Sequence, residues 1–215
     1  MSLGGLFGVG TSALNAAYMQ LQTTGHNIAN VNTPGYSRQE VVLGSAGANG
    51  TGAGFIGRGV EVATVKRRYD QFLNAEVTAT TAAAAGDKTR ATQLARLDDM
   101  LANTDVGIGA ALDDLTASFA DVVNRPFDAS ARNVVQRRVE TVVERIGSVS
   151  AGLDNMLEDV DQRLQQAVET TNNQLRTLAD LNNLIAKASG SGQTPNDLLD
   201  RRDALVEEIS GTIQA

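Results

Sequence analysis

The amino-acid sequence predicts a mainly α fold, an elongated antiparallel helical bundle or coiled-coil rod with a small β-hairpin after an N-terminal heptad helix. Apolar residues recur three and four positions apart over most of the chain, which is the period of an amphipathic helix. Aromatic residues make up only 4% of the 215, so long helices with thin apolar seams are expected rather than a thick core. Strand-like alternation is confined to residues 37–43 and 59–65.

The first predicted helix covers residues 5–31. A seven-residue repeat places large apolar side chains on one stripe, at Phe7, Leu14, Leu21 and Ile28. A thin seam cannot by itself offset the conformational entropy of a helix, so this one needs a partner helix. We therefore expect residues 1–31 of an isolated chain to be mobile or packed on a neighbouring copy. An ordinary core helix of a globular domain is the alternative.

The segment "NTPGY" is a strong stop for this helix. Pro34 has no N–H and pushes Thr33 out of the helical region, and Pro34-Gly35 suits the centre of a type II turn. Asn30 and Asn32 tolerate the left-handed conformation that closes a helix C-terminus.

A β-hairpin is predicted next, with a long loop at residues 44–59 that contains seven glycines. Residues 52–57 of this loop match the pattern G-x-G-x-x-G. Nucleotide binding requires a strand directly before that pattern and a helix directly after it, and neither is present. The glycines therefore indicate a flexible loop.

Helices are predicted for the rest of the chain. One runs from about Tyr69 to about Asn103, with a possible kink at residues 82–86, and a turn at 104–109 follows. A shorter helix ends at Arg125-Pro126. The longest predicted helix is capped by Asp128 or Ser130 and reaches about Ser189, a length of roughly 60 residues. The alternative is two helices with a break near residues 147–152. In the last helix, Thr194 is the expected cap, Pro195 the first helical residue and Asp197 the partner in a capping box.

No arrangement of residues supports catalysis, so the chain is not expected to be an enzyme. Absence of cysteine excludes thiolate chemistry, and with a single histidine, His26, neither a Ser/His/Asp triad nor a two-histidine metal site is expected. No cofactor is predicted. The net charge of −7 argues against nucleic-acid binding, and no apolar run in residues 1–37 can cross a bilayer or serve as a Sec signal.

Charged clusters are read as local features of the surface. The basic run 66–68 is expected to be a solvated junction between a strand and a helix. Adjacent acidic pairs, as at 98–99, splay around a helix and form a solvated face. The run 200–203 offers charges of both signs for local ion pairs or a rim contact.

Two motifs give the sequence a family resemblance. "HNIANVNTPGYSRQ" resembles the signature of the flagellar axial proteins, that is, the rod, hook and hook-associated proteins. "PNDLLDRRDALVEEIS", about 160 residues later, resembles the hook-associated proteins of the hook–filament junction, and "GRGVEVATVKRRYDQFL" also fits their pattern. The resemblance covers essentially the whole chain. Members of the family continue into outer β domains and a terminal helix, so the chain is expected to be the N-terminal portion of such a protein.

The resemblance implies a structural adaptor at the hook–filament junction, with an axial-core helix and turn (1–36), a β-hairpin connector (37–66) and an incomplete helical rod domain (67–215). It implies three groups of functional residues. They are an assembly motif (Asn27, Asn30, Asn32, Thr33, Pro34, Gly35 and Tyr36), an axial seam (Phe7, Leu14, Leu21 and Ile28) and a rod-domain motif (Asn196, Leu198, Leu199, Asp200, Arg202 and Asp203).

The implied partners are other copies of the chain, the hook protein and the second junction protein. Export through the flagellar type III apparatus is implied, with a chaperone that binds the C-terminal end of family members, and no membrane insertion. The competing interpretation is a non-flagellar coiled-coil binding module or a secreted helical effector, for which the proline turn would have no role. An enzyme built on a helical bundle is a third interpretation and would require convergent polar groups in a pocket.

Overall fold

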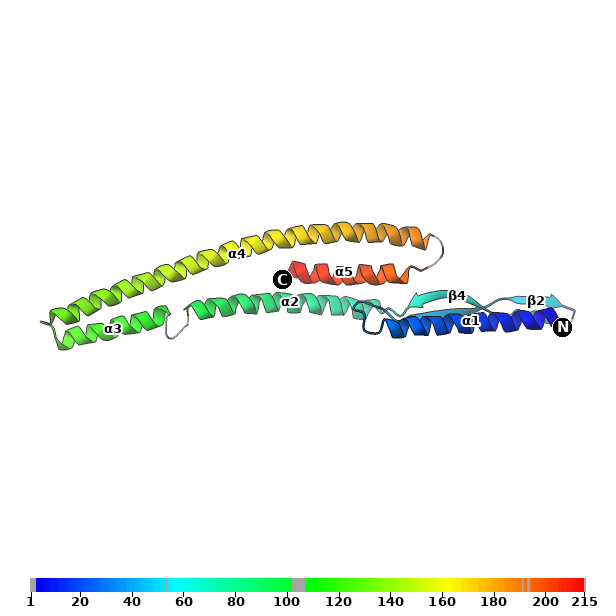
Figure 1. The fold of residues 1–215 in the computed structure, drawn as a ribbon, viewed down its shortest axis with the longest axis horizontal. Coiled ribbons are helices and arrows are strands. Elements are labelled where there is room, and N and C mark those ends of the chain that lie inside the picture. The colour runs from blue at the N-terminus through cyan, green and yellow to red at the C-terminus, as the bar shows by residue number, and fades with distance from the viewer. Residues whose placement is uncertain (1–2, 53, 102–106, 191, 193, 215) are drawn as a thin grey trace. The chain divides into compact units, whose positions relative to one another are not determined.

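The structure, a computed structural model, describes residues 3–52, 54–101, 107–190, 192 and 194–214 (Figure 1). Its elements in chain order are α1 (Leu3–Ala29), β1 (Gln39–Ser45), β2 (Ala48–Thr51), β3 (Gly54–Gly57), β4 (Val60–Arg67), α2 (Gln71–Leu101), α3 (Ile108–Asn124), α4 (Ala129–Ser189) and α5 (Asn196–Gln214). The predicted mainly α fold, with a β-hairpin directly after the first helix, is confirmed. In these ranges no helix combines the length and the apolar character that crossing a bilayer requires.

Contacts divide the chain into two compact units. Residues 1–81 and 172–211 form the first unit, and residues 82–171 with 212–215 form the second. Helices α2, α4 and α5 contribute residues to both, so this grouping follows contacts rather than chain position. The three domain boundaries expected from the sequence stay a prediction.

In the first unit, α1 lies along the β-hairpin (Figure 1). The helix face turned toward the hairpin carries buried or half-buried residues spaced by three and four, namely Ser12, Ala16, Met19, Thr23 and Asn27. The Ser12 hydroxyl accepts a hydrogen bond from the Val60 amide at 3.3 Å. One face of α1 therefore packs on the hairpin of its own chain, and the expectation that the helix needs a partner helix stays a prediction.

Strands β1 and β4 form the predicted hairpin, with Gln39 opposite Arg67 and Leu43 opposite Val62. The register shifts between Val42 and Leu43. The expectation of a flexible glycine loop is wrong, because β2 and β3 pair as a second antiparallel ribbon. Bonds from the amide of Ala46 to the Gly59 carbonyl (3.1 Å) and from the amide of Arg58 to the Gly47 carbonyl (2.9 Å) join the two ribbons. The hydrogen bonds of the β1–β4 hairpin thus continue into the glycine-rich segment and bring β2 and β3 side by side.

Helix α2 starts at Gln71 because Asp70 caps it. Its carboxylate accepts hydrogen bonds from the amides of Phe72 (3.0 Å) and Leu73 (3.1 Å). No break occurs at residues 82–86, where alanine favours the helix and Ala82 is buried. The predicted helix end at Asn103 and the start of the following turn lie outside the described residues.

Helix α4 is continuous over 61 residues, as predicted, and about 90 Å long. The amide of Ser130 donates to the carboxylate of Asp128 at 2.8 Å, which makes Asp128 the capping residue. In the second unit α4 runs antiparallel to α2: Arg96 pairs with Asp159 at 2.9 Å, while the later residue Met100 packs over the earlier Gly152. Helix α3 is also antiparallel to α4, and Arg138 pairs with Asp114 at 2.8 Å.

Candidate assembly site

The end of α1 is closed by the side chain of Asn30. Both the amide and Nδ2 of Asn30 donate to the His26 carbonyl, at 3.1 and 2.9 Å, and the Asn30 carbonyl accepts from the Thr33 amide at 2.9 Å. No non-glycine residue in the described ranges has a positive φ. The left-handed conformation that Asn30 and Asn32 tolerate is therefore not used here, because a side chain and a tight turn satisfy the last carbonyls instead.

The Thr33–Tyr36 segment forms the turn that the sequence predicts. The Tyr36 amide donates to the Thr33 carbonyl at 3.2 Å, and Gly35 has φ of +76°. A Cβ atom at Gly35 would lie 3.1 Å from the Cβ of Ala204, so this turn packs closely on α5. Glycine is required here by both its backbone conformation and the close approach of α5.

Asn27 joins α1 to strand β1 in the way that a neighbouring strand would. Its Nδ2 donates to the Gln39 carbonyl at 2.8 Å, and its Oδ1 accepts from the Gln39 amide at 2.8 Å. The same Oδ1 accepts from the Tyr36 hydroxyl at 2.7 Å. One amide side chain therefore satisfies both outward backbone groups at the start of the hairpin and fixes the angle at which α1 meets it.

This arrangement also orients His26. Asn27 cannot flip without placing donor against donor at Gln39, so the Tyr36 hydroxyl donates its only hydrogen to Asn27. His26 Nδ1, 3.0 Å from the same hydroxyl, must then be the donor. Burial, together with the charges of Asp200 and Asp197, raises the pKa of Tyr36 above its ordinary value of 10.0, which keeps the hydroxyl protonated.

Arg67, at the end of β4, lies at the centre of a buried ion-pair cluster with α5. Its Nη1 is 2.9 Å from Asp200 Oδ1 and 2.6 Å from Asp203 Oδ2; the latter is an ion-pair contact without hydrogen-bond alignment. Side chains of Arg67 and Asp200 are each only 8% exposed. The guanidinium also stacks over the Tyr69 ring, 4.2 Å from its centre. Asp200 additionally accepts from the Ser37 amide at 3.0 Å, which ties the cluster to the assembly motif.

The basic run 66–68 is thus not simply a solvated junction. Lys66 and Arg68 are the exposed members, and both pair with Glu40, at 3.4 and 2.9 Å. Arg67 points the other way and is buried because side chains alternate across a strand.

The start of α5 completes the contact with the hairpin. Asn196 is nine-tenths buried and donates through Nδ2 to the Val65 carbonyl at 2.8 Å. The helix begins at Asn196, one residue later than predicted, and the Pro195 carbonyl accepts its first hydrogen bonds. Asp197 accepts from Gln39 Nε2 at 3.2 Å, so the predicted capping box with Thr194 is replaced by a contact between elements.

The remaining residues of the rod-domain motif support this packing. Leu198 and Leu199 are half-buried. Nε and Nη2 of Arg202 donate to Asp203 Oδ1 at 2.9 and 2.6 Å. Arg202 thereby supplies a counter-charge for Asp203, the second carboxylate that contacts Arg67. The structure therefore brings the assembly motif and the rod-domain motif together at one junction, although they are about 160 residues apart.

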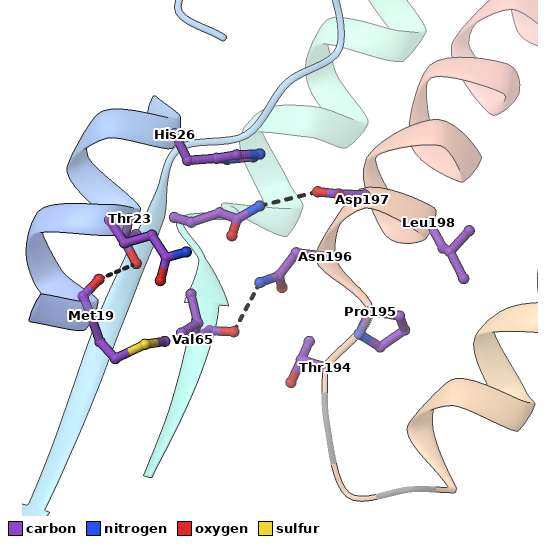
Figure 2. Close-up of a pocket in the computed structure, with 11 residues that line it drawn as sticks. Met19, Thr23, His26, Val65, Thr194, Pro195, Asn196, Asp197 and Leu198 are labelled. Atoms are coloured by element: carbon purple, nitrogen blue, oxygen red, sulfur yellow. Dashed lines mark hydrogen bonds between the residues drawn. The ribbon is translucent and has the colours of Figure 1, made fainter. Parts of the chain in front are cut away.

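An open groove of about 520 Å³ lies between α1, the hairpin and the start of α5 (Figure 2). Met19, Val65, Pro195 and Leu198 supply apolar surface, while Gln22, His26 and Asp197 supply polar groups. Among the described residues no cluster of histidine, cysteine or carboxylate side chains suits a metal ion.

The axial seam lies apart from this junction, on the opposite face of α1. Phe7, Leu14, Leu21 and Ile28 are 69%, 71%, 71% and 69% exposed. Successive members lie seven residues apart, so they form one continuous stripe along the helix. Monomeric proteins rarely expose a continuous apolar stripe of this kind.

Two residues of the junction, Ser37 and Gln39, were not singled out in the sequence, and Arg67 was considered only as part of the basic run 66–68. Ser37 acts through its backbone amide, and Gln39 acts through both of its backbone groups as well as through its side chain on Asp197. Contacts of backbone groups leave no pattern in the sequence. A signal for Arg67 did exist, since a basic residue ends an alternating strand and two aspartates stand three apart in a later helix. Only the fold places the two features in contact.

Comparison with known proteins agrees with these features. A family model described as flagellar hook-associated protein FlgK helical domain matches residues 94–215, and one described as flagella basal body rod protein matches residues 7–36. Flagellar hook-associated protein 1 of Salmonella typhimurium (strain LT2) is 32% identical over 201 residues, which are 93% of this chain and 36% of the relative. The protein of that name from Bacillus subtilis (strain 168) is 33% identical over 210 residues, 94% of this chain and 41% of the relative.

The chain spans about two fifths of the length of these relatives. Its match to the helical-domain model covers more than half of its residues, and the rod-protein match ends at Tyr36, the last residue of the assembly motif. The chain belongs to the FlgK family of flagellar hook-associated proteins.

Proposed function

We propose that the chain is a structural subunit of the bacterial flagellum and acts as an adaptor at the hook–filament junction. Its membership of a family named for hook association supports this role. Because the chain spans only part of its relatives, the proposal concerns what these residues contribute: an axial helix, a junction that holds it at a set angle, and the beginning of a helical rod.

The observation that carries the proposal is the exposed axial seam of α1. Its four large side chains are about 70% exposed, while the opposite face of the helix is already covered by the hairpin. Burying such a side chain stabilises a contact by roughly 1.5–3 kcal/mol. A seam of four repeats is therefore sufficient to hold subunits together through helix packing, and heterologous contacts of this kind build tubes.

The assembly motif, in this proposal, sets the direction of α1 relative to the hairpin and α5. Asn27 and Asp200 act from opposite sides, on Gln39 and Ser37, so the turn between these two contacts has little freedom. A fixed angle matters in an axial structure because a small change of the angle at the junction would displace the far end of the helix by a much larger distance.

The partners proposed for the chain are other copies of itself, the hook protein and the second junction protein. We further propose export through the flagellar type III apparatus. The chaperone site is placed in the C-terminal portion of the full-length protein, so the 215 residues should bind that chaperone weakly. Co-purification of the chaperone with the full-length protein and with the 215-residue chain tests this point.

The function is tested by complementing a deletion strain with full-length protein that carries Leu14→Asn and Leu21→Asn. Both side chains are exposed, so the free energy of unfolding should change by less than about 0.5 kcal/mol per site. Motility should nevertheless be lost, with filament subunits shed into the medium and hooks still present by electron microscopy.

Leu14→Met with Leu21→Met is the matched control, because it keeps apolar bulk on the seam and should restore swimming. Normal motility of the asparagine variant would contradict the proposed role of the seam. A deletion strain that keeps its filaments would contradict the function itself.

A further inference from the structure

The 215 residues contain one Asn-Gly pair, Asn49-Gly50, and it lies in strand β2 of the glycine-rich ribbon. An asparagine followed by glycine is especially prone to lose its side-chain amide, because glycine has no side chain to hinder the attack of its own backbone nitrogen on the asparagine Cγ. Both residues are exposed, and the Asn49 side chain makes no hydrogen bond with a described residue. The groups that would react are therefore free and open to water.

The other described asparagines lack these conditions. Asn30 and Asn32 lie in the turn after α1, where the amide that follows each of them donates a hydrogen bond, at 3.4 and 2.9 Å. Asparagines inside the helices precede amides that donate along the helix. Asn196, at the start of α5, is buried and donates to the Val65 carbonyl. The structure thus distinguishes Asn49 from asparagines that are held in place.

The ribbon itself restrains Asn49 only weakly. Strands β2 and β3 pair over four positions, and a two-stranded ribbon of this length is at best marginally stable. Gly50 stands opposite Phe55, and glycine inside a strand weakens the pairing further. The segment can therefore open and reach the bent conformation in which the Gly50 nitrogen meets Cγ of Asn49.

Arg58 is placed to favour the reaction. Asn49 stands directly opposite Ile56, so the two side chains share one face of the ribbon. Arg58 comes two residues after Ile56 and lies on that same face, and its amide continues the ladder by donating to the Gly47 carbonyl at 2.9 Å. Diagonal neighbours of this kind are roughly 7–8 Å apart, which is within reach of a long side chain. Arg58 is exposed and makes no ion pair with a described carboxylate, so its charge is available to Asn49.

We infer that Asn49 is a site of spontaneous deamidation and that Arg58 promotes the reaction. The Gly50 nitrogen gives its proton to water and attacks Cγ of Asn49. A bond forms between these atoms, the bond from Cγ to the side-chain nitrogen breaks, and ammonia leaves after taking a proton from water. A second water then opens the cyclic imide at either carbonyl and gives aspartate or isoaspartate. The Arg58 guanidinium stabilises the negative charge that develops on the Asn49 oxygen and pairs with the carboxylate of the product.

The two products affect the ribbon differently. Aspartate keeps the length of the backbone and adds a negative charge on the face of Arg58. Isoaspartate carries the backbone through the side-chain carbon, which lengthens the chain between positions 49 and 50 and disturbs the pairing with Ile56 and Phe55. The inference concerns the chemistry of the ribbon and does not rest on the proposed function.

The test is incubation of the purified full-length protein, followed by peptide mass spectrometry. In alkaline buffer Asn49 should be replaced by aspartate and isoaspartate, and protein isoaspartyl methyltransferase should label that peptide. Mildly acidic buffer should slow the reaction, because the attacking nitrogen must lose its proton. Asn15, which is exposed on α1, is the internal control and should stay intact. An Asn49 that stays intact in the folded protein, under conditions that deamidate the urea-unfolded protein, would overturn the inference.

Variants separate the two parts of the inference. Gly50→Ala should slow the loss of Asn49 severalfold; its methyl group would lie 3.6 Å from the Phe55 ring, an ordinary contact, so the ribbon should be kept. Arg58→Gln should slow the reaction by about twofold to fivefold, as expected for an exposed charge, and Arg58→Lys should retain most of the rate. An unchanged rate in Gly50→Ala would exclude the Gly50 nitrogen as the attacking group. An unchanged rate in Arg58→Gln would overturn the role given to Arg58.

Discussion

Arg67 and Asp200 form a buried ion pair that joins the end of strand β4 to helix α5 across 133 residues of sequence. The pair also holds the assembly motif, because the second oxygen of Asp200 accepts from the Ser37 amide. A single carboxylate therefore links the hairpin, the turn and the last helix. This connection makes the junction of the first unit sensitive to changes that would be mild on a surface.

Replacing Arg67 with methionine should destabilise the chain by about 3–5 kcal/mol, because it leaves the buried carboxylate of Asp200 without its counter-charge. Urea denaturation followed by circular dichroism measures the loss. Arg138→Met is the matched control, since the Arg138–Asp114 pair is about half exposed and should contribute less than about 1 kcal/mol. Equal losses in the two variants would show that burial of the Arg67 cluster has no energetic consequence.

Gly35→Ala should destabilise the junction by about 1–2 kcal/mol. The left-handed backbone at Gly35 is unfavourable for alanine, and the added methyl group meets Ala204. Gly25→Ala, inside α1 and four residues before its end, has no atom near the added methyl group and should instead stabilise the chain by about 0.5–1 kcal/mol. Thermal unfolding of both variants is a direct check, and a shift in the same direction for both would contradict the turn assignment.

Asn27→Ala should lower the free energy of unfolding by about 1–3 kcal/mol. The variant loses both hydrogen bonds to Gln39 and leaves the Tyr36 hydroxyl without its acceptor. Faster hydrogen exchange of the Gln39 amide, measured by NMR, would locate the effect. Asn15→Ala, on an exposed position of the same helix, should leave stability unchanged or raise it by up to about 0.7 kcal/mol, because alanine favours a helix more than asparagine does. A loss there comparable to that of Asn27→Ala would contradict the role given to the Gln39 contacts.

The second unit should lose stability in acid partly through Asp159. Hydrogen bonds from Arg96 and then Arg163 lower the pKa of Asp159 below its ordinary value of 3.8. As the pH falls, the unfolded chain takes up this proton first, so the contribution is present above pH 3.8 and disappears as the pH falls through the lowered folded pKa.

Asp159→Asn removes this titration. Denaturation midpoints measured from about pH 5 to about pH 2 should therefore fall less steeply in Asp159→Asn than in the unchanged protein. Arg96→Met should flatten the curve in the same direction because it removes the larger cause of the shift. Identical slopes in all three proteins would exclude a contribution from this carboxylate.

Local chemistry was sufficient to predict the helices, the turn and the exposed seam. The apolar period of α4, the proline after α3 and the Pro34-Gly35 pair act within a few residues of themselves, so their effect does not depend on distant partners. The repeat of Phe7 to Ile28 likewise defines a stripe for any straight helix, and the structure leaves that stripe uncovered.

Only the tertiary structure decided the contacts between residues that are remote in the sequence, because these depend on where each strand and helix lies in the folded chain. The glycine-rich segment pairs as β2 and β3 because the β1–β4 ladder delivers its two ends side by side. Arg67 is buried rather than solvated because α5 returns to the hairpin with Asp200 facing it. The periodicity of the sequence indicates which face of a helix or strand is apolar. It does not indicate which residue pairs with a buried charge, because that residue can be remote in the sequence and comes close only when the chain folds.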